Sequence, residues 1–204
     1  MKRTAIAFYW TFPVPWAGFN QIDTRDIDTA ASQSKTIAMQ RQAVRAYASS
    51  EGLVIIHETA HIELAPDRGS KEIKGELQNL AKLADLQQAK ILYVDFGEAI
   101  HQRSHQYLRS FVGEHSTMFE AVALDWSIEQ KFRDHFSNWR KQQENWTRGK
   151  AERIALARAR TLDLLDEGRK LPEIAQSLEA EGLRSATGKP WNADSLRKML
   201  KQSA

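Results

Sequence analysis

The last quarter of the chain, residues 151–199, is the segment that most constrains the fold. Apolar residues recur there at helical spacing in three short stretches, and a glycine follows each of the first two. Pro172 suits the first turn of the second stretch, and Asn192 is a good N-cap for the third. We therefore expect three short helices joined by tight turns, over residues 151–167, 172–181 and 193–201.

Each expected helix has an apolar face that could contribute to a common core. The residues expected to face inward are Ile154, Leu162 and Leu165, then Ile174, Ala175 and Leu178, then Leu196, Met199 and Leu200. The third helix would present Ser195, Arg197, Lys198 and Lys201 to solvent. An apolar seat with a polar, basic outer face is typical of a helix-turn-helix, whose last helix enters the major groove of DNA. The alternative is a small helical bundle whose basic surface is merely solvated.

The distribution of charge favours the first interpretation. Residues 1–130 carry 13 Lys and Arg against 16 Asp and Glu, whereas residues 131–204 carry 16 against 10, a net charge of +6. A basic module on a mildly acidic body indicates a polyanionic partner, here double-stranded DNA. The candidate DNA-binding residues are Arg148 and Lys150 in an expected hinge at residues 147–150, followed by Arg184, Thr187, Lys189, Trp191, Asn192, Ser195, Arg197, Lys198 and Lys201.

The first 127 residues alternate between β-prone runs and helical patterns. Strands are expected at residues 4–10, 53–56, 91–94 and 118–124, helices at 36–52, 70–86 and 102–112, and a long loop at 17–35. This alternation predicts an α/β domain in which a mostly parallel sheet is flanked by helices on both faces. With 204 residues, the chain can add one small satellite domain, which residues 151–204 would form.

Composition excludes several other classes of protein. The chain has no cysteine, which rules out disulfides and thiolate zinc sites and favours a reducing compartment. No apolar run approaches the roughly 18 residues that span a bilayer, so we expect no membrane segment. The basic start of the chain lacks a small-residue cleavage site and is expected to be a strand rather than a signal peptide. We therefore expect a cytoplasmic, nucleoid-associated protein.

An aromatic stripe marks the segment between the two domains. Ile128, Phe132, Phe136 and Trp139 are spaced to lie on one face of a long helix that runs from residue 128 to about residue 146, before the hinge at 147–150. Such a stripe either packs on its own domain or forms a dimer seam with a second copy. We assign these four residues as candidate dimerisation residues.

Several runs resemble the serine recombinases, the resolvase/invertase family. In the C-terminal quarter, the resemblance is carried by residues 157–168, 171–178, 181–191 and 195–200, which follow the family pattern of its DNA-binding domain closely, with Ser185 in place of a threonine. In the N-terminal part, residues 40–48 with Gly52 resemble the family's first helix, while Leu77, Leu80 and residues 92–94 fit its next helix and strand. The resemblance implies a resolvase-like α/β fold, a long linking helix, and a homodimer or higher homo-oligomer on DNA.

The residues that cut DNA in this family are replaced. The family's Tyr-x-Arg-x-Ser corresponds to residues 8–12, where Trp10 stands for the arginine and Phe12 for the nucleophilic serine. Lys74-Gly75 stands for an Arg-Pro, and residues 97–101 stand for Asp-Arg-Leu-x-Arg, which places Glu98 where an arginine belongs. Losing one preorganised donor costs on the order of 10²–10³ in rate, and here nucleophile and donors are lost together. We therefore expect no catalytic residue, no cofactor and no enzyme activity.

Two enzymatic alternatives remain open at this point. Thr11, Ser32 or Ser34 could act as a displaced nucleophile in an active recombinase. His57-Glu58-Thr59-Ala60-His61 also matches the H-E-x-x-H signature of zinc proteases. That motif directly follows a strand, where residues four apart lie roughly 13 Å from each other and cannot share one zinc ion. The favoured hypothesis is a sequence-specific DNA-binding protein that regulates, maintains or assists a mobile element or replicon.

Overall fold

The computed structural model describes residues 3–65, 69–97 and 105–201 and divides the chain into two compact units. The N-terminal unit comprises residues up to 13 together with 21–137, and the C-terminal unit comprises 14–20 together with 138–204. The boundary between the two units falls after residue 137, within the segment expected to form the linking helix. In the described part of the chain, no helix is long and apolar enough to cross a membrane.

The N-terminal unit is built on a four-stranded sheet with the order β2-β1-β3-β4. The strands are β1 (Arg3–Thr11), β2 (Leu53–Ile62), β3 (Lys90–Tyr93) and β4 (Phe119–Ala121), and all three neighbouring pairs are parallel. The predicted parallel sheet flanked by helices is therefore confirmed. Because β1 lies in the interior of the sheet, residues Ala5 to Tyr9 are fully buried.

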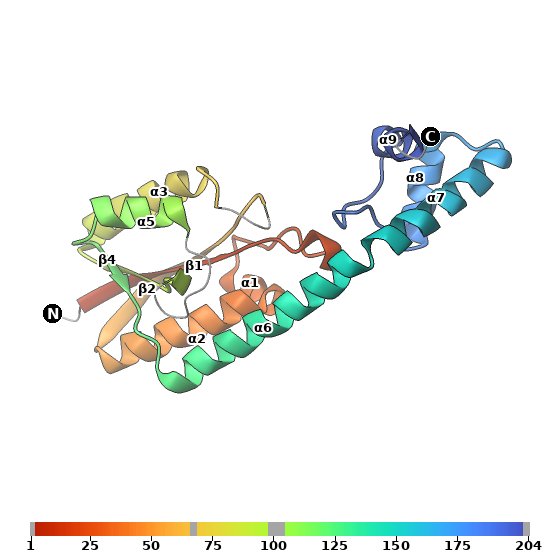
Figure 1. Ribbon diagram of the computed structural model, residues 1–204. Helices are drawn as coiled ribbons and strands as arrows, with labels where there is room; N and C mark the ends of the chain where they lie inside the picture. Colours follow the sequence, from red (N-terminus) through yellow and green to blue (C-terminus); the bar gives the residue numbers. More distant parts are fainter. Residues whose placement is uncertain (1–2, 66–68, 98–104, 202–204) are drawn as a thin grey trace. The chain divides into compact units, whose positions relative to one another are not determined.

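Helices cover both faces of this sheet (Figure 1). One face carries α1 (Ile27–Gln33), α2 (Lys35–Ser50) and the first half of α6 (Trp126–Arg148), and the other carries α3 (Ile73–Gln87) and α5 (Gln106–Glu114). Each helix turns its apolar stripe to the sheet, as Ile37 and Val44 of α2 and Ile73 and Leu77 of α3 show by being fully buried.

The expectation of a loop over residues 17–35 was wrong. A short 3₁₀ turn occupies Pro15–Ala17, and α1 forms because the Asp26 carboxylate accepts hydrogen bonds from the Asp28 N–H (3.0 Å) and the Thr29 hydroxyl (2.5 Å). Ser34 then caps α2, with its hydroxyl accepting from the Ile37 N–H at 3.3 Å. The caps at both ends of α1 thus stabilise a helix that the hydrophobic pattern of this polar segment does not predict.

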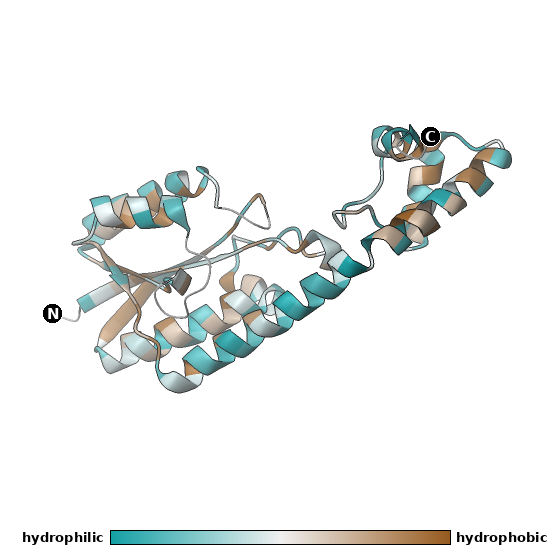
Figure 2. Cartoon of the chain, in the orientation of Figure 1, coloured by the Kyte–Doolittle hydropathy of each residue, from teal (hydrophilic) through white to brown (hydrophobic). Residues whose placement is uncertain are grey.

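The C-terminal unit contains the second half of α6 and the helices α7 (Lys150–Asp166), α8 (Leu171–Ala180) and α9 (Ala193–Lys201). Its core is formed by Ala157, Leu164, Ile174, Ala175, Leu178, Trp191, Leu196 and Met199. The three helices are those expected from the sequence. Figure 2 shows apolar residues on both sides of α7, which is unusual for a helix at the surface of a small unit.

The inward face of α7 differs from the expected one. Ala157 and Leu164 are fully buried, whereas Leu162, which we expected inward, is 44% exposed. Ile154 and Leu165 pack only partly against the core. The positions 157, 161 and 164 follow the i, i+4, i+7 spacing of one helical face, and Leu162 lies on the opposite side. Leu162 and Leu164 are equally hydrophobic, so the sequence alone did not tell which of them faces the core.

The buried amide of Gln40 ties α2 to the end of β1. Its Nε2 donates to the Trp10 carbonyl at 2.7 Å, and its Oε1 accepts from the Trp10 N–H at 3.2 Å. The side chain is fully buried and therefore replaces the water that these backbone groups would otherwise bind.

Gln40→Leu should lower the free energy of unfolding by about 2 kcal/mol, because it leaves a buried N–H and C=O of Trp10 without partners. Urea denaturation followed by circular dichroism measures this change. The matched variant Gln78→Leu, on the exposed side of α3, should change stability by less than about 0.5 kcal/mol. Equal effects of the two variants would show that the amide clamp contributes nothing.

Candidate nucleic-acid interface

The third helix of the C-terminal unit, α9, is fixed at its N-terminus by a reciprocal pair of hydrogen bonds. The Ser195 N–H donates to Asn192 Oδ1 at 2.8 Å, and the Asn192 N–H donates to Ser195 Oγ at 2.9 Å. Leu196 and Met199 are buried against α7 and α8. The cap and the apolar seat hold the helix in one orientation, which a helix that reads DNA requires.

The outward face of α9 is basic. Arg197, Lys198 and Lys201 are all exposed and share one helical face with Asp194. The Arg197 guanidinium pairs with the Asp194 carboxylate at 2.5 Å, which orients the side chain along the helix. Lys198 and Lys201 have no ion-pair partner among the residues that the structure describes. Two unneutralised ammonium groups on one face suit phosphate contacts.

The turn before α9 carries two further candidates at the surface. The Ser185 N–H donates to the Lys189 carbonyl at 3.0 Å, and the Gly188 N–H donates to the Ser185 carbonyl at 2.9 Å. Thr187 and Lys189 are exposed at this turn. Arg184 precedes it, and its Nη1 donates to Glu179 of α8 at 3.1 Å. The turn therefore presents a cation close in sequence to the start of α9.

Three of the expected DNA-binding residues make structural contacts within this unit. Trp191 is only 9% exposed and belongs to the core that seats α9. The Ser195 hydroxyl and the Asn192 amide serve the helix cap described above, so Asn192 remains exposed with its oxygen already engaged. Sequence cannot separate residues that build a recognition helix from residues that contact DNA, because both occur at the same positions of the motif.

The expected hinge is reduced to a single residue. Gly149 alone separates α6 from α7, and it adopts φ −75° and ψ 5°. Arg148, whose side chain is 78% exposed, lies 3.9 Å from Glu144. Lys150 begins α7 and is exposed. Both cations thus flank the break between the helices.

Sequence reasoning missed an aromatic cluster in this unit. Trp16, from the segment after β1, stacks on Trp146 of α6 with ring centroids 5.9 Å apart, and the Arg153 guanidinium lies 3.4 Å from the Trp146 ring. Gly188 packs so closely on Trp16 that an added Cβ would lie 2.2 Å from the Trp16 Cα. No local sequence pattern predicts this contact, because Trp16 lies more than 100 residues before its partners in the sequence.

The aromatic stripe of α6 is largely used within the subunit. Phe132 is fully buried in the N-terminal unit, and Ile128 and Phe136 pack against the same core. Phe132 is thus covered by its own unit, whereas Ile128 and Phe136 are covered only in part, and a dimerisation role for these residues stays a prediction. For Trp139, which is half-buried, a role in dimerisation stays a prediction.

Aromatic rings fill the carboxyl end of β1, where the family places its nucleophile. Trp10 makes edge-to-face contacts with Phe12 (5.3 Å between centroids) and Phe96 (5.2 Å). Phe96 in turn contacts Phe132 and Phe136 of α6 at 5.4 and 5.3 Å. Such a cluster lacks the donors that would stabilise charge on a phosphate.

The alternative nucleophiles are tied to structural positions. Thr11 is 4% exposed and Ser34 is 5% exposed, with the Ser34 hydroxyl engaged in capping α2. Ser32 is exposed on α1, and its hydroxyl donates to the Thr29 carbonyl at 2.8 Å. Lys74 lies 5.9 Å from the centroid of the Tyr107 ring. Glu98 and the other residues aligned with the family's arginines at 98–101 lie outside the described residues.

A buried carboxylate–histidine pair lies beside Trp10. His105 Nε2 is 2.5 Å from Glu63 Oε1, both side chains are fully buried, and the His105 ring packs edge-on against Trp10 at 5.2 Å. His105 Nδ1 accepts from the Leu108 N–H at 3.2 Å, so Nε2 is the ring nitrogen that donates to Glu63. Burial alone would raise the pKa of Glu63, but the hydrogen bonds from His105, His61 and Ser70 together outweigh it and lower that pKa. The pair therefore caps α5 and anchors it to the end of β2.

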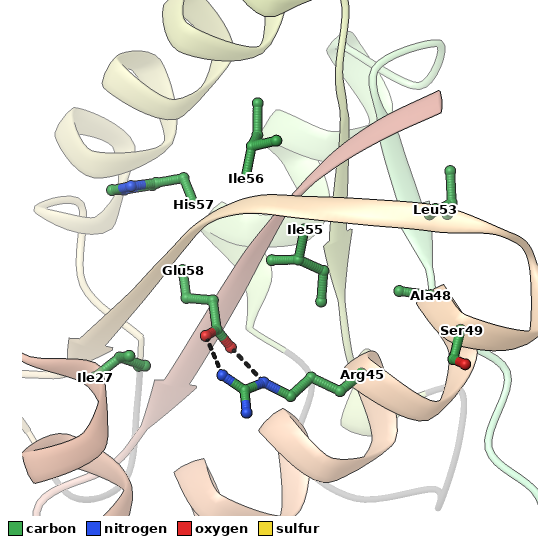
Figure 3. Close-up of a pocket in the computed structure, with 9 residues that line it drawn as sticks. All are labelled: Ile27, Arg45, Ala48, Ser49, Leu53, Ile55, Ile56, His57 and Glu58. Atoms are coloured by element: carbon green, nitrogen blue, oxygen red, sulfur yellow. Dashed lines mark hydrogen bonds and ion pairs between the residues drawn. The ribbon is translucent and has the colours of Figure 1, made fainter. Parts of the chain in front are cut away.

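The H-E-x-x-H sequence lies entirely on β2, as its context predicted. His57 is exposed, and His61 Nε2 lies 3.3 Å from Glu63. Figure 3 shows the Glu58 carboxylate turned toward Arg45, in a pocket also lined by Ile27, Ala48, Ser49, Leu53, Ile55, Ile56 and His57. In the described ranges, no group of three His, Cys, Asp or Glu side chains is placed to hold a metal ion.

Glu58 is the centre of a charge network rather than a general base. Its carboxylate accepts from Arg45 (2.6 Å), Arg41 (3.2 Å) and the Tyr9 hydroxyl (2.7 Å). Burial would raise the pKa of Glu58, but these three donors outweigh it and lower the pKa to about 2. Burial and the bond to Glu58 raise the pKa of Tyr9. A carboxylate held this way is a poor proton acceptor near neutral pH.

Because the pKa of Glu58 falls from 4.5 to about 2 on folding, its contribution to stability should be present above pH 4.5 and lost as the pH drops toward 2. Glu58→Gln should therefore lower the free energy of unfolding by up to about 3 kcal/mol at pH 7. Denaturation measured from pH 7 to pH 2 should show this difference shrinking below pH 4.5. A difference independent of pH would contradict the network.

Residues 151–204 match the family model described as Recombinase. The C-terminal part of the chain is thus similar to a recombinase domain, and the match does not extend to residues 1–150. No curated protein and no solved structure matches the chain significantly. The match covers α7, α8 and α9 with their connecting turns, which is the part that carries the basic face described above.

Proposed function

We propose that this protein binds double-stranded DNA sequence-specifically by placing α9 in the major groove. The observation that carries the proposal is the exposed basic face of α9, with Lys198 and Lys201 on a helix fixed by its cap and by Leu196. In this arrangement Arg197 approaches base edges or phosphates once it exchanges Asp194 for DNA. Lys189 contacts the backbone from the preceding turn. A recombinase domain implies DNA binding and oligomerisation in general.

We further propose that the N-terminal unit is a scaffold that does not cleave DNA. Support comes from the aromatic cluster around Trp10 and Phe12, which occupies the place of an arginine and a serine, and from the burial of Thr11. Strand cleavage needs an accessible hydroxyl beside donors that stabilise the phosphate. At this end of β1 the Thr11 hydroxyl is buried, and its neighbours Trp10 and Phe12 are aromatic. The protein then acts as a regulator, or as an accessory or maintenance factor of a mobile element or replicon.

Binding to DNA is tested first by selection. Purified protein is mixed with sheared source-genome DNA at about 0.15 M salt, where binding through phosphates alone is weakened. The fragments that it retains on native gels are then sequenced. Enrichment of a few fragments that share an inverted repeat supports a sequence-specific oligomer. Uniform retention would contradict sequence specificity, and no retention would overturn DNA binding by this unit.

On a selected fragment, the double variant Lys198→Ala/Lys201→Ala should weaken binding and reduce the slope of log K against log salt by about 2, since each lysine releases roughly one counterion. Titration by fluorescence anisotropy at several salt concentrations measures both quantities. The control Lys71→Ala/Lys82→Ala, on exposed sites of the N-terminal unit, should leave the slope unchanged. An unchanged slope in the α9 variant would exclude that helix from the interface.

The scaffold role predicts that no covalent protein–DNA adduct forms on supercoiled DNA bearing the selected site. Denaturing gels with labelled DNA detect such an adduct, which a serine recombinase traps through its phosphoserine bond. The rival function, an active recombinase with a displaced nucleophile, predicts an adduct that disappears in Ser32→Ala, Ser34→Ala or Thr11→Val. Any adduct of this kind would overturn the scaffold role.

A further inference from the structure

The outer side of α7 carries an apolar seam that the DNA-binding function does not use. It consists of Ala155, Leu156, Ala159 and Leu162, all of them exposed, with Leu156 at 55% and Leu162 at 44%. We call these four residues the α7 outer seam. The seam is exposed because α7 buries Ala157 and Leu164, which leaves Leu162 on the far side of the helix and Leu156 on its flank.

The outer seam has the spacing of a helix-docking surface. Positions 152, 155, 159, 162 and 166 follow each other at intervals of three and four residues, which is the spacing that keeps side chains on one side of a helix facing a partner helix. The small side chains of Ala155 and Ala159 allow a second helix to approach closely, and Leu156 and Leu162 border that approach. The seam spans about two helical turns, or roughly 11 Å.

Carboxylates flank the seam at both ends. Glu152 precedes it, and Asp163 and Asp166 border its C-terminal end, all three exposed. None of the three has an ion-pair partner among the described residues. The seam lies on the side of α7 opposite the residues that pack on α8 and α9, so it faces away from the basic surface of α9.

The charges also decide against a second copy of this chain as the occupant. An antiparallel pairing centred on Ala159 brings Glu152 against Asp166 of the other copy twice, since both residues are seven positions from Ala159. A parallel pairing sets each carboxylate against its own counterpart. Like charges on a helix interface destabilise it, whereas opposite charges select the partner.

We infer that the α7 outer seam docks a basic amphipathic helix of another protein, whose apolar side chains lie over Ala155 and Ala159 and whose lysines or arginines meet Glu152, Asp163 and Asp166. This binding is helix-on-helix recognition through a short apolar stripe with a polar rim. The inference goes beyond DNA binding by α9, because a domain bound to DNA through α9 would present this seam outward and recruit a partner to the site.

The test uses the full chain and a fluorescent synthetic peptide about four helical turns long, with leucines on one face, lysines beside them and alanines elsewhere. Anisotropy titration should show binding of this peptide and no binding of a matched peptide with glutamate in place of lysine. Leu156→Glu and Leu162→Glu should each weaken binding by about tenfold or more. Glu152→Gln/Asp166→Asn should weaken it several-fold and reduce its dependence on salt.

Leu86→Glu is the matched control, because Leu86 is 78% exposed on α3 of the other unit. It should leave peptide binding unchanged, and all seam variants should keep their affinity for DNA, which separates failure of this inference from failure of DNA binding. Equal binding of the lysine and glutamate peptides, no binding of either, or full binding by Leu156→Glu would overturn the inference. So would light scattering that shows an oligomer which Leu156→Glu dissociates, because the occupant would then be a second copy.

Discussion

Burial of the Trp10 ring is the interaction on which the N-terminal unit depends. The ring touches Phe12, Phe96 and His105, and its backbone is held by Gln40. Through Phe96 it connects the sheet to α6, and through His105 it connects the sheet to α5. A side chain of this size at the end of β1 leaves no room for a solvated polar group there. The same contacts that consolidate the fold place aromatic rings where the proposed scaffold role needs no catalytic donor.

Much of this architecture follows from pattern, and the departures have physical causes. Runs such as Leu53 to Ile56 predict strands because a buried parallel strand must be apolar. The aromatic pattern of α6 likewise predicts an apolar helix face. It does not predict the packing partner of that face, because an aromatic side chain packs as well on its own domain as on a second copy. The structure resolves this choice for Phe132. The helix α1 was missed because its formation depends on capping by Asp26 rather than on an apolar stripe.

For the candidate interface, the sequence predicts the position of the helix but not the role of each residue on it. Position and polarity locate α9 and its basic face, since the face opposite Leu196 and Met199 must meet solvent. Position and polarity do not predict that Trp191 is part of the core, or that the polar groups of Asn192 and Ser195 form the cap of α9. Those assignments depend on distances between turns and helices, which a linear pattern does not contain. The contact between Trp16 and Trp146 is the extreme case, because its partners are remote in sequence.

The central place of β1 also governs how the chain can fold as it is made. Its two neighbours are β2, beginning at Leu53, and β3, beginning at Lys90. A ribosome therefore releases the apolar run from Ala5 to Trp10 well before either pairing partner exists. Closing these long loops is slow compared with helix formation, so the nascent strand stays exposed to misassociation. Early chaperone contact would matter more for this segment than for the C-terminal helices, whose contacts are mostly local.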